Sequence, residues 1–196
     1  MGFLSVLSFA HKLVSERLRT GEAALDATAG TGADTLFLAR CVGSKGKVFA
    51  FDIQEEALEL TRSRLAKEPP ASLGEVSLHL ESHARMNSCV PGQLHGRIGA
   101  VMFNLGYLPA DTADKQIMTE PESTIAALES SLQLLRPGGI ITIVLYPGHQ
   151  GGDTEAAAVE AWAARLPWNT AQTIVYRGLQ RPDAPYLIAL ERKKPL

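Results

Sequence analysis

The chain has 196 residues and a mass of 21.1 kDa; 45% of the residues are hydrophobic, 20% are charged, and the formal net charge is −2. This length predicts one domain over residues 1–196 with its own hydrophobic core. The composition excludes disordered, collagen-like and strongly basic, histone-like proteins. Because Cys41 and Cys89 form no CxxC pair, we expect no zinc site and no metal.

The first residues are apolar but do not resemble a targeting or membrane-spanning segment. Met1–Ala10 contains no basic residue, and Lys12 follows at once. A helix that crosses a bilayer needs about 20 apolar residues, many more than this stretch provides. We therefore expect a cytoplasmic protein without a membrane partner, whose first helix packs on the domain.

Apolar periodicity and turn residues predict strands that alternate with helices. The predicted elements in chain order are a helix at 3–18, a strand at 23–27, a helix from 34, a strand at 47–51, a helix at 55–67, strands at 76–80 and 98–104, a helix at 122–135, a strand at 140–146, a helix at 154–166, and strands at 173–176 and 186–191. The alternation predicts an α/β fold with a mostly parallel sheet. The last two strands have only a short loop between them, which predicts an antiparallel hairpin.

The loop after the first strand has the features of a nucleotide-cofactor site. Gly30 and Gly32 permit a tight turn at the start of a helix, and Asp52 ends the second strand, where a carboxylate can accept ribose hydroxyls. Thr35 occupies the place of the third glycine of a dinucleotide fingerprint. Asp26 suits a cationic ligand and would repel a pyrophosphate. These features favour S-adenosylmethionine over NAD, and NAD-dependent oxidoreduction is the disfavoured alternative.

Further residues complete the predicted cofactor site. Asp34 opens the helix, where it either contacts the cofactor or acts as an N-cap. Ser82 and His83 follow the third strand, where such folds bind the adenine ring, although His83 could also be an exposed loop histidine. The predicted cofactor-binding residues are Asp26, Ala27, Thr28, Gly30, Gly32, Asp34, Thr35, Asp52, Ile53, Gln54, Ser82, His83, Asn104, Leu105 and Gly106.

The loops after the fourth and fifth strands are candidates for the substrate site. Asn104–Pro109 is similar to the Asn-Pro-Pro-Tyr motif of methyltransferases that act on exocyclic amines, with Leu-Gly in place of Pro-Pro. In this interpretation Asn104 accepts a hydrogen bond from the amine and Tyr107 stacks on a base. His149, in the glycine-rich segment Tyr146–Gly152, is a candidate base. The alternatives are a polar strand end, a packed tyrosine and a solvated histidine.

With these motifs, almost the whole chain resembles the small bacterial methyltransferases that were first described as rRNA methylases. Members are now assigned as tRNA methyltransferases that act on 5-aminomethyl-2-thiouridine at the wobble position. The matching segments are Ala10-His11, Asp26–Leu38, Phe51–Gln54, Ser82-His83, Phe103–Pro109, Asp114-Lys115, Tyr146–Gly152 and Pro185–Glu191. The chain departs from the family at Thr31-Gly32-Ala33, at the longer Ala110–Lys115, and in a threonine-rich run reduced to Thr119, Ser123 and Thr124.

The resemblance implies a Rossmann-like class I methyltransferase fold: a seven-stranded, mostly parallel sheet with a C-terminal antiparallel hairpin and helices on both faces. It implies transfer of a methyl group to the exocyclic amine of the modified uridine, which gives the 5-methylaminomethyl form. An alkylammonium has a pKa of about 10, so the amine must first lose a proton. The implied catalytic residues are Asn104, Tyr107 and His149, and the implied substrate-binding residues are His11, Tyr107, Lys115, Tyr146 and His149.

The expected partner is tRNA, through its anticodon stem-loop, and the resemblance favours a homodimer. Basic residues gather in two places that could contact RNA or be solvated: Arg177, Arg181, Arg192, Lys193 and Lys194 near the C-terminus, and His11, Lys12, Arg17 and Arg19 on the first helix. Two other functions remain open. The enzyme could methylate rRNA or a small amine, or the chain could bind S-adenosylmethionine without catalysis.

Overall fold

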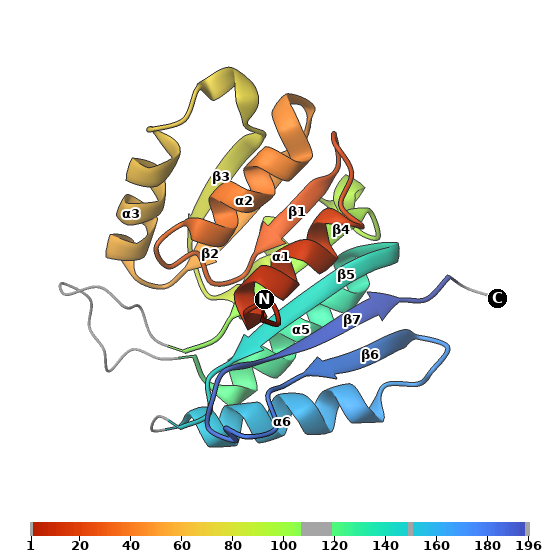
Figure 1. The fold of residues 1–196 in the computed structure, drawn as a ribbon. Helices are drawn as coiled ribbons and strands as arrows, with labels where there is room; N and C mark the ends of the chain where they lie inside the picture. Colours follow the sequence, from red (N-terminus) through yellow and green to blue (C-terminus); the bar gives the residue numbers. More distant parts are fainter. Residues whose placement is uncertain (1, 107–118, 149–150, 195–196) are drawn as a thin grey trace.

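A computed structural model describes residues 2–106, 119–148 and 151–194 of the chain. It contains a seven-stranded sheet in the order β3-β2-β1-β4-β5-β7-β6 (Figure 1). The strands are β1 Ala23–Asp26, β2 Lys47–Asp52, β3 Glu75–Leu80, β4 Ile98–Asn104, β5 Leu135–Leu145, β6 Ala171–Tyr176 and β7 Tyr186–Arg192. Strands β1 to β5 are parallel, and β7 is antiparallel to both β5 and β6. The predicted α/β fold with a terminal hairpin is therefore confirmed.

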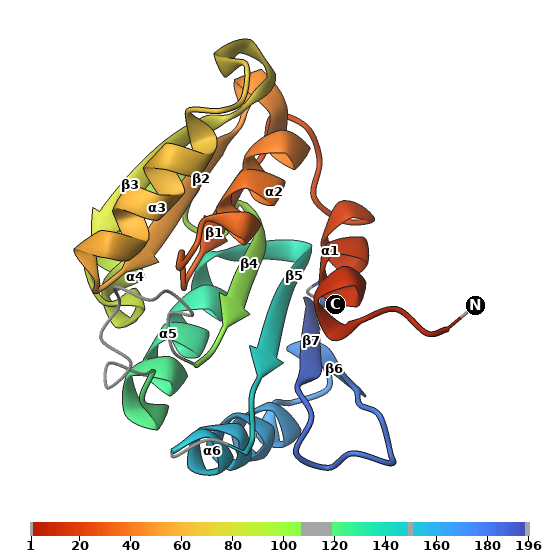
Figure 2. The ribbon, with the colours of Figure 1, turned by 60° about the vertical axis from the view of Figure 1, so that its left-hand side comes forward.

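Helices cover both faces of this sheet. In Figure 1, α1, α2 and α3 lie in front of the strands, and α5 and α6 lie behind them; Figure 2 shows the same layers from another side. The helices are α1 Val6–Ser15, α2 Ala33–Val42, α3 Glu55–Leu65, α4 Met86–Cys89, α5 Pro121–Leu134 and α6 Gly152–Arg165. Among the described residues, no helix is long and apolar enough to cross a membrane.

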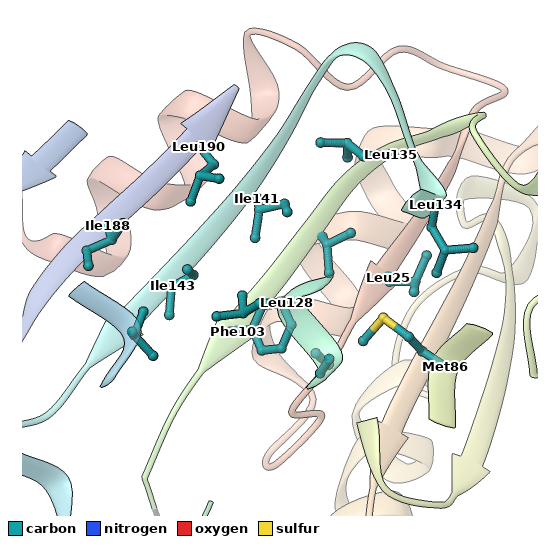
Figure 3. Packing of buried hydrophobic residues seen from close by; sticks show 14 of the residues in the cluster. Leu25, Met86, Phe103, Leu128, Leu134, Leu135, Ile141, Ile143, Ile188 and Leu190 are labelled. Atoms are coloured by element: carbon teal, nitrogen blue, oxygen red, sulfur yellow. The ribbon is translucent and has the colours of Figure 1, made fainter. Parts of the chain in front are cut away.

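Alternate side chains of the central strands enter two separate cores. On the side of α5 and α6, Leu25, Phe103 and Ile141 pack with residues such as Leu128 (Figure 3). On the opposite side, smaller side chains of the same strands, including Ala24 and Ala100, pack against α1 and α2. A buried parallel strand has no polar face, which explains why β4 is apolar along nearly its whole length. Each fully buried large side chain contributes about 1.5–3 kcal/mol of transfer free energy.

The first helix differs from the prediction. It begins at Val6, because the Ser5 hydroxyl accepts a hydrogen bond from the Ser8 amide and caps the helix. Its buried face is formed by Ala10, Leu13 and Val14. Leu4 and Leu7, two apolar residues within the helix predicted at 3–18, lie outside this buried face, since 47% and 39% of their surfaces are exposed.

The fifth strand is longer than predicted. This strand was predicted at 140–146, but β5 starts at Leu135, which pairs with Ile98, and it includes Pro137, Gly138 and Gly139. The register between β4 and β5 shifts between Ile98 and Ala100, so the extra residues are accommodated as an irregularity inside the strand pair. The short helix α4 was also missed, because one turn of helix leaves no periodic apolar pattern. The boundaries of the single domain stay a prediction.

Candidate active site

A cavity of about 420 Å³ lies at the carboxyl ends of the parallel strands. Ligands of open α/β sheets bind at this edge, where the order of the strands reverses; here β1 lies between β2 and β4. The lining residues that the sequence predicted are Ala27, Thr28, Gly30, Asp34, Asp52, Ile53, Gln54, Ser82, His83, Asn104, Leu105, Gly106 and Tyr146. The described lining also includes Thr31, Glu81, Thr119 and Ser123, which the predicted site did not contain.

Asp52 fixes the glycine loop from the end of β2. Its two carboxylate oxygens accept hydrogen bonds from the Gly30 amide at 2.9 Å and the Gln54 amide at 3.0 Å. Gly32 has a φ of +77°, and a Cβ atom there would lie 2.7 Å from the Thr61 Cα atom. Glycine at position 32 therefore provides both the left-handed conformation and the close approach to α3.

Asp26 lies behind the cavity wall rather than in it. The residue is fully buried, and its carboxylate accepts hydrogen bonds from the Thr28 amide at 3.1 Å and the Thr35 hydroxyl at 2.6 Å. Burial, followed by the nearby charge of Asp34, raises the pKa of Asp26 to about 7, although the Thr35 hydrogen bond acts in the opposite direction. Asp26, Gly32 and Thr35 are thus placed to hold the loop, and none of the three is among the residues that line the cavity.

Asp34 does not cap helix α2. Gly32 occupies the N-cap position, so the alternative interpretation of Asp34 as an N-cap is wrong. The Asp34 side chain is 9% exposed, and its Oδ1 atom lies 2.6 Å from Nε2 of His11. The His11 ring stacks on Phe37 with the ring centroids 3.9 Å apart. The structure therefore links His11 to the cavity through Asp34, although His11 itself is not among the lining residues.

His83, which follows β3, also lines the cavity. The side chain is buried, and its Nδ1 atom lies 3.1 Å from the Ala27 carbonyl oxygen. Burial lowers the pKa of His83, more than the Ala27 hydrogen bond and the charge of Asp52 raise it. A neutral ring that donates from Nδ1 leaves Nε2 as an acceptor, which suits the amino group of an adenine. The alternative of an exposed loop histidine is wrong.

Asn104 and Tyr146 end the adjacent strands β4 and β5. The Asn104 amide nitrogen of the backbone donates a hydrogen bond to the Thr28 hydroxyl at 2.7 Å, which ties β4 to the glycine loop. The Asn104 Oδ1 atom is buried and has no hydrogen-bond partner among the described residues. Burial, then the charge of Asp34, raises the pKa of Tyr146, while the Asn104 side chain acts to lower it. Asn104 therefore offers an unused acceptor beside a tyrosine that stays protonated.

A buried carboxylate supports this end of the cavity and was missed in the sequence. Glu155 of α6 is 3% exposed, and its two oxygens accept hydrogen bonds from the Thr119 and Thr124 hydroxyls, both at 2.7 Å. Thr119 also accepts a hydrogen bond from the Gly106 amide at 3.1 Å. Glu155 resembles an ordinary acidic residue in the first turn of a helix, so the only available signal was the set of threonines at 119 and 124.

Three predicted site residues, Tyr107, Lys115 and His149, lie outside the described residues. Of the basic residues near the C-terminus, several make contacts within the protein. Arg177 forms an ion pair with Glu160 and lies 3.9 Å above the Tyr186 ring, and Lys193 lies 4.8 Å above the Trp168 ring. Across the described parts of the chain, no three His, Cys, Asp or Glu side chains form a candidate metal site.

Known proteins match the chain in sequence and structure. A family model described as "Putative rRNA methylase" matches residues 48–191, and a model of the ubiE/COQ5 methyltransferase family matches residues 7–83. A curated tRNA (mnm(5)s(2)U34)-methyltransferase, chloroplastic, from Arabidopsis thaliana is 36% identical over 94% of this chain and 68% of its own length.

Two solved structures extend this similarity. A "putative rRNA-methylase" from Clostridium thermocellum is 33% identical, with a TM-score of 0.90 over 98% of this chain and 100% of the other. SMU.1697c from Streptococcus mutans, described as "a putative methyltransferase" and solved in complex with SAH, is 32% identical, with a TM-score of 0.84 over 97% and 99% of the two chains. Fold, cavity and relatives define the class: an S-adenosylmethionine-dependent methyltransferase. Within that class, the chain belongs to the rRNA methylase family whose model matches residues 48–191.

The residues of the cavity fit this cofactor. A volume of about 420 Å³ lies in the range of small-molecule sites. The charged side chains among the described lining residues are Asp34, Asp52 and Glu81, with no lysine or arginine, which suits a ligand with positively charged sulfonium and ammonium groups. Asp52 and His83 both line the cavity, and their contacts with the ribose and the adenine stay predictions. Bound S-adenosylmethionine supplies an electrophilic methyl group at this site.

Proposed function

We propose that this enzyme methylates the exocyclic amine of 5-aminomethyl-2-thiouridine at the wobble position of tRNA and produces 5-methylaminomethyl-2-thiouridine. The observation that carries the proposal is the buried Oδ1 atom of Asn104, an acceptor without a partner among the described residues. The name of the 36% identical Arabidopsis relative, a tRNA (mnm(5)s(2)U34)-methyltransferase, supports the same substrate.

The free acceptor atom of Asn104 matches a primary amine. A buried polar atom without a hydrogen bond costs about 1–3 kcal/mol, and an N–H group of the amine removes this cost when it binds. The same hydrogen bond orients the nitrogen lone pair away from Asn104 and into the cavity. Since orientation of the reacting groups supplies about 7–11 kcal/mol in favourable cases, positioning by Asn104 is a principal contribution of the chain to the reaction.

Tyr146 acts beside Asn104 as a hydrogen-bonding residue rather than as a base. Its raised pKa keeps the phenol protonated at neutral pH. A protonated phenol can donate to the substrate and can close the cavity wall beside Pro147, which also lines it. Tyr107, Lys115 and His149 remain predicted contacts of the substrate, and the anticodon stem-loop and the homodimer remain predicted partners.

The test is methyl transfer to RNA in vitro. The enzyme is incubated with methyl-labelled S-adenosylmethionine and bulk tRNA from cells that lack this gene, and the nucleosides are analysed by mass spectrometry. We expect labelled 5-methylaminomethyl-2-thiouridine to appear as the aminomethyl precursor disappears.

A parallel incubation with rRNA tests the second candidate, which the description of the matching family model favours. Labelled rRNA together with unchanged tRNA nucleosides would replace the proposed substrate by rRNA. If the cofactor binds and neither RNA is labelled, the proposed substrate is wrong and small amines are the next class to test.

A further inference from the structure

The first turn of α6 carries a buried carboxylate that the reaction described above does not yet use. Glu155 is 3% exposed and is not among the residues that line the cavity. Its two oxygens accept hydrogen bonds from the hydroxyls of Thr119, which lines the cavity, and Thr124. In the described parts of the chain, no lysine, arginine or histidine forms an ion pair with Glu155. Both hydroxyl bonds lead to one short segment beside the cavity.

Stability alone does not explain a carboxylate at this position. Removing a carboxylate from water costs free energy, which its hydrogen bonds and the dipole at the start of α6 offset at best. An apolar side chain packed in the same place would stabilise the fold at least as well. The effect of Glu155 therefore lies in the two hydroxyl groups that it holds.

The Thr119 hydroxyl passes this restraint to the chain segment that follows β4. Because a carboxylate only accepts hydrogen bonds, the Thr119 hydroxyl donates its proton to Glu155, and its oxygen is left to accept. That oxygen accepts from the Gly106 amide at 3.1 Å, and the Thr119 amide donates in return to the Gly106 carbonyl at 3.2 Å. Glu155 thus sets the polarity of the Thr119 hydroxyl so that it matches the donor of Gly106.

The restraint on Gly106 is one of three that hold the end of β4. The Asn104 amide is bonded to the glycine loop, and the Leu105 amide is bonded to the carbonyl of Val144 on β5 at 3.0 Å. The third amide, that of Gly106, has the Thr119 hydroxyl as its partner. Loss of Glu155 should therefore loosen Gly106 and, two residues away, the Asn104 side chain.

We propose that Glu155 is a positioning residue for methyl transfer: through Thr119 and Gly106 it holds the Asn104 carboxamide in the orientation that receives the methyl acceptor. Since Glu155 does not line the cavity, it acts on the reaction only through its neighbours. The acceptor role of Asn104 comes from the proposed function, and the inference rests on that function in this respect. The restraint of Gly106 by Glu155 is independent of which substrate the enzyme methylates.

The test measures the restraint and its effect on catalysis separately. Glu155→Leu removes both acceptor oxygens at similar side-chain volume, and Glu155→Gln keeps one of them. Thr119→Val removes the hydroxyl, Thr119→Ser restores it, and Glu129→Gln, at an exposed glutamate of α5, is the matched control. Hydrogen exchange of the Gly106 amide, followed by NMR, reports the restraint without RNA. Single-turnover transfer from methyl-labelled S-adenosylmethionine to the RNA that the wild type labels reports catalysis.

In the exchange experiment we expect the Gly106 amide of Glu155→Leu and Thr119→Val to exchange about 10-fold faster than in the wild type, the scale for one net hydrogen bond. Amides in the centre of β1, which report global stability, should change by less. Glu155→Gln should give a smaller increase, and Thr119→Ser and Glu129→Gln should exchange like the wild type. Unchanged exchange of Gly106 in both Glu155→Leu and Thr119→Val would overturn the inference, and either variant alone suffices if the other does not fold.

In the transfer experiment we expect the rate constant at saturating RNA to fall about 10–100-fold in Glu155→Leu, since misplacement by about 1 Å costs up to about 100-fold. The affinity for S-adenosylmethionine should stay within a few-fold. The double variant Glu155→Leu/Thr119→Val should lose no more rate than Thr119→Val, because both substitutions break one chain of contacts. A wild-type rate in folded Glu155→Leu, or losses that multiply in the double variant, would overturn the inference. If the wild type labels no RNA, the proposed function fails, and the exchange of Gly106 decides whether Glu155 holds this segment.

Discussion

The two ends of the cavity differ in how their polar groups are satisfied. At the cofactor end, the carboxylates of Asp26 and Asp52 each accept two hydrogen bonds from within the protein. At the acceptor end, Oδ1 of Asn104 is buried with no partner among the described residues. The first arrangement sets the shape of the glycine loop before any ligand binds, and the second leaves an acceptor for the amine of the proposed substrate. Substitutions at the two ends should therefore separate cofactor binding from methyl transfer.

The largest effect is expected at the acceptor end, on the rate. Asn104→Ala should reduce the single-turnover rate of methyl transfer by about 100-fold or more, the scale for loss of a group that positions the reactants. The backbone bond from Asn104 to Thr28 survives the substitution, so S-adenosylmethionine should bind within a few-fold of its wild-type affinity. Rapid-quench transfer assays and calorimetry measure the two quantities. Asn169→Ala, at an exposed asparagine, is the control, and unchanged turnover in Asn104→Ala would refute the assigned acceptor role.

At the cofactor end, the main effect should be on affinity. Asp52→Ala removes the predicted ribose contact and the anchor of the Gly30 amide. We expect S-adenosylmethionine to bind less tightly by about 1.5–3 kcal/mol, the range for hydrogen bonds to a charged group. Glu129→Ala changes an exposed carboxylate on α5 and serves as the control in the same titration. Wild-type affinity in Asp52→Ala would exclude the ribose assignment.

The shape of the glycine loop can be tested by adding one carbon atom. Gly32→Ala should lower the free energy of unfolding by about 2 kcal/mol, because the new Cβ atom combines a strained positive φ with overlap against α3. Gly96 has a similar φ of +72°, and a Cβ atom there meets no atom within 4 Å. Gly96→Ala therefore measures the conformational strain alone, and denaturant unfolding of both variants separates strain from overlap. Equal losses would show that the loop does not pack tightly against Thr61.

A further effect on stability is expected from the charge of Asp26, and it depends on pH. An unfolded aspartate titrates near its model value of 3.8, whereas the folded protein holds the pKa of Asp26 at about 7. Between these two pKa values the folded protein binds one proton more than the unfolded chain does. Protonated Asp26 therefore contributes its full stabilisation of the folded state below about pH 4, and this stabilisation is lost as the pH rises to about 7. The loss should not exceed about 1.4 kcal/mol per pH unit.

Asp26→Asn should remove this decline, because the amide can still bond to Thr28 and Thr35. Chemical denaturation of wild type and variant at several pH values provides the comparison, and Asp183→Asn, at an exposed carboxyl, is the control. Parallel pH profiles of wild type and Asp26→Asn would show that the buried carboxyl does not titrate in this window.

The sequence predicted the sheet and the cofactor loop because their signals are local. Each strand is a short apolar run bounded by turn residues, and Gly30, Gly32 and Asp52 occupy places fixed by the strand–turn–helix geometry. The strand Ile98–Asn104 was predicted to the residue. The start of the fifth strand was predicted five residues too late, because pairing with β4 carries β5 through Pro137 and the two glycines after it.

The missed features depend on contacts between distant residues. His11 and Asp34 were each singled out in the sequence. They are 23 residues apart in the chain, and their contact joins helix α1 to helix α2. Glu155 lies 31 residues beyond Thr124, and no local pattern distinguishes it from a solvated helix residue. These two separate contacts form only when α1 and α2 on one face, and α5 and α6 on the other, pack on the sheet.

The central claim is that the acceptor end of the cavity is completed by a primary amine on tRNA. It is tested most directly by comparing two tRNA substrates that differ only in the aminomethyl group: tRNA with 5-aminomethyl-2-thiouridine at the wobble position, and the same tRNA with 2-thiouridine there. Each is incubated with enzyme and methyl-labelled S-adenosylmethionine, and the label in the RNA is counted. We expect close to one methyl group per molecule of the first tRNA and none in the second. Equal labelling of both, or of neither, would contradict the claim.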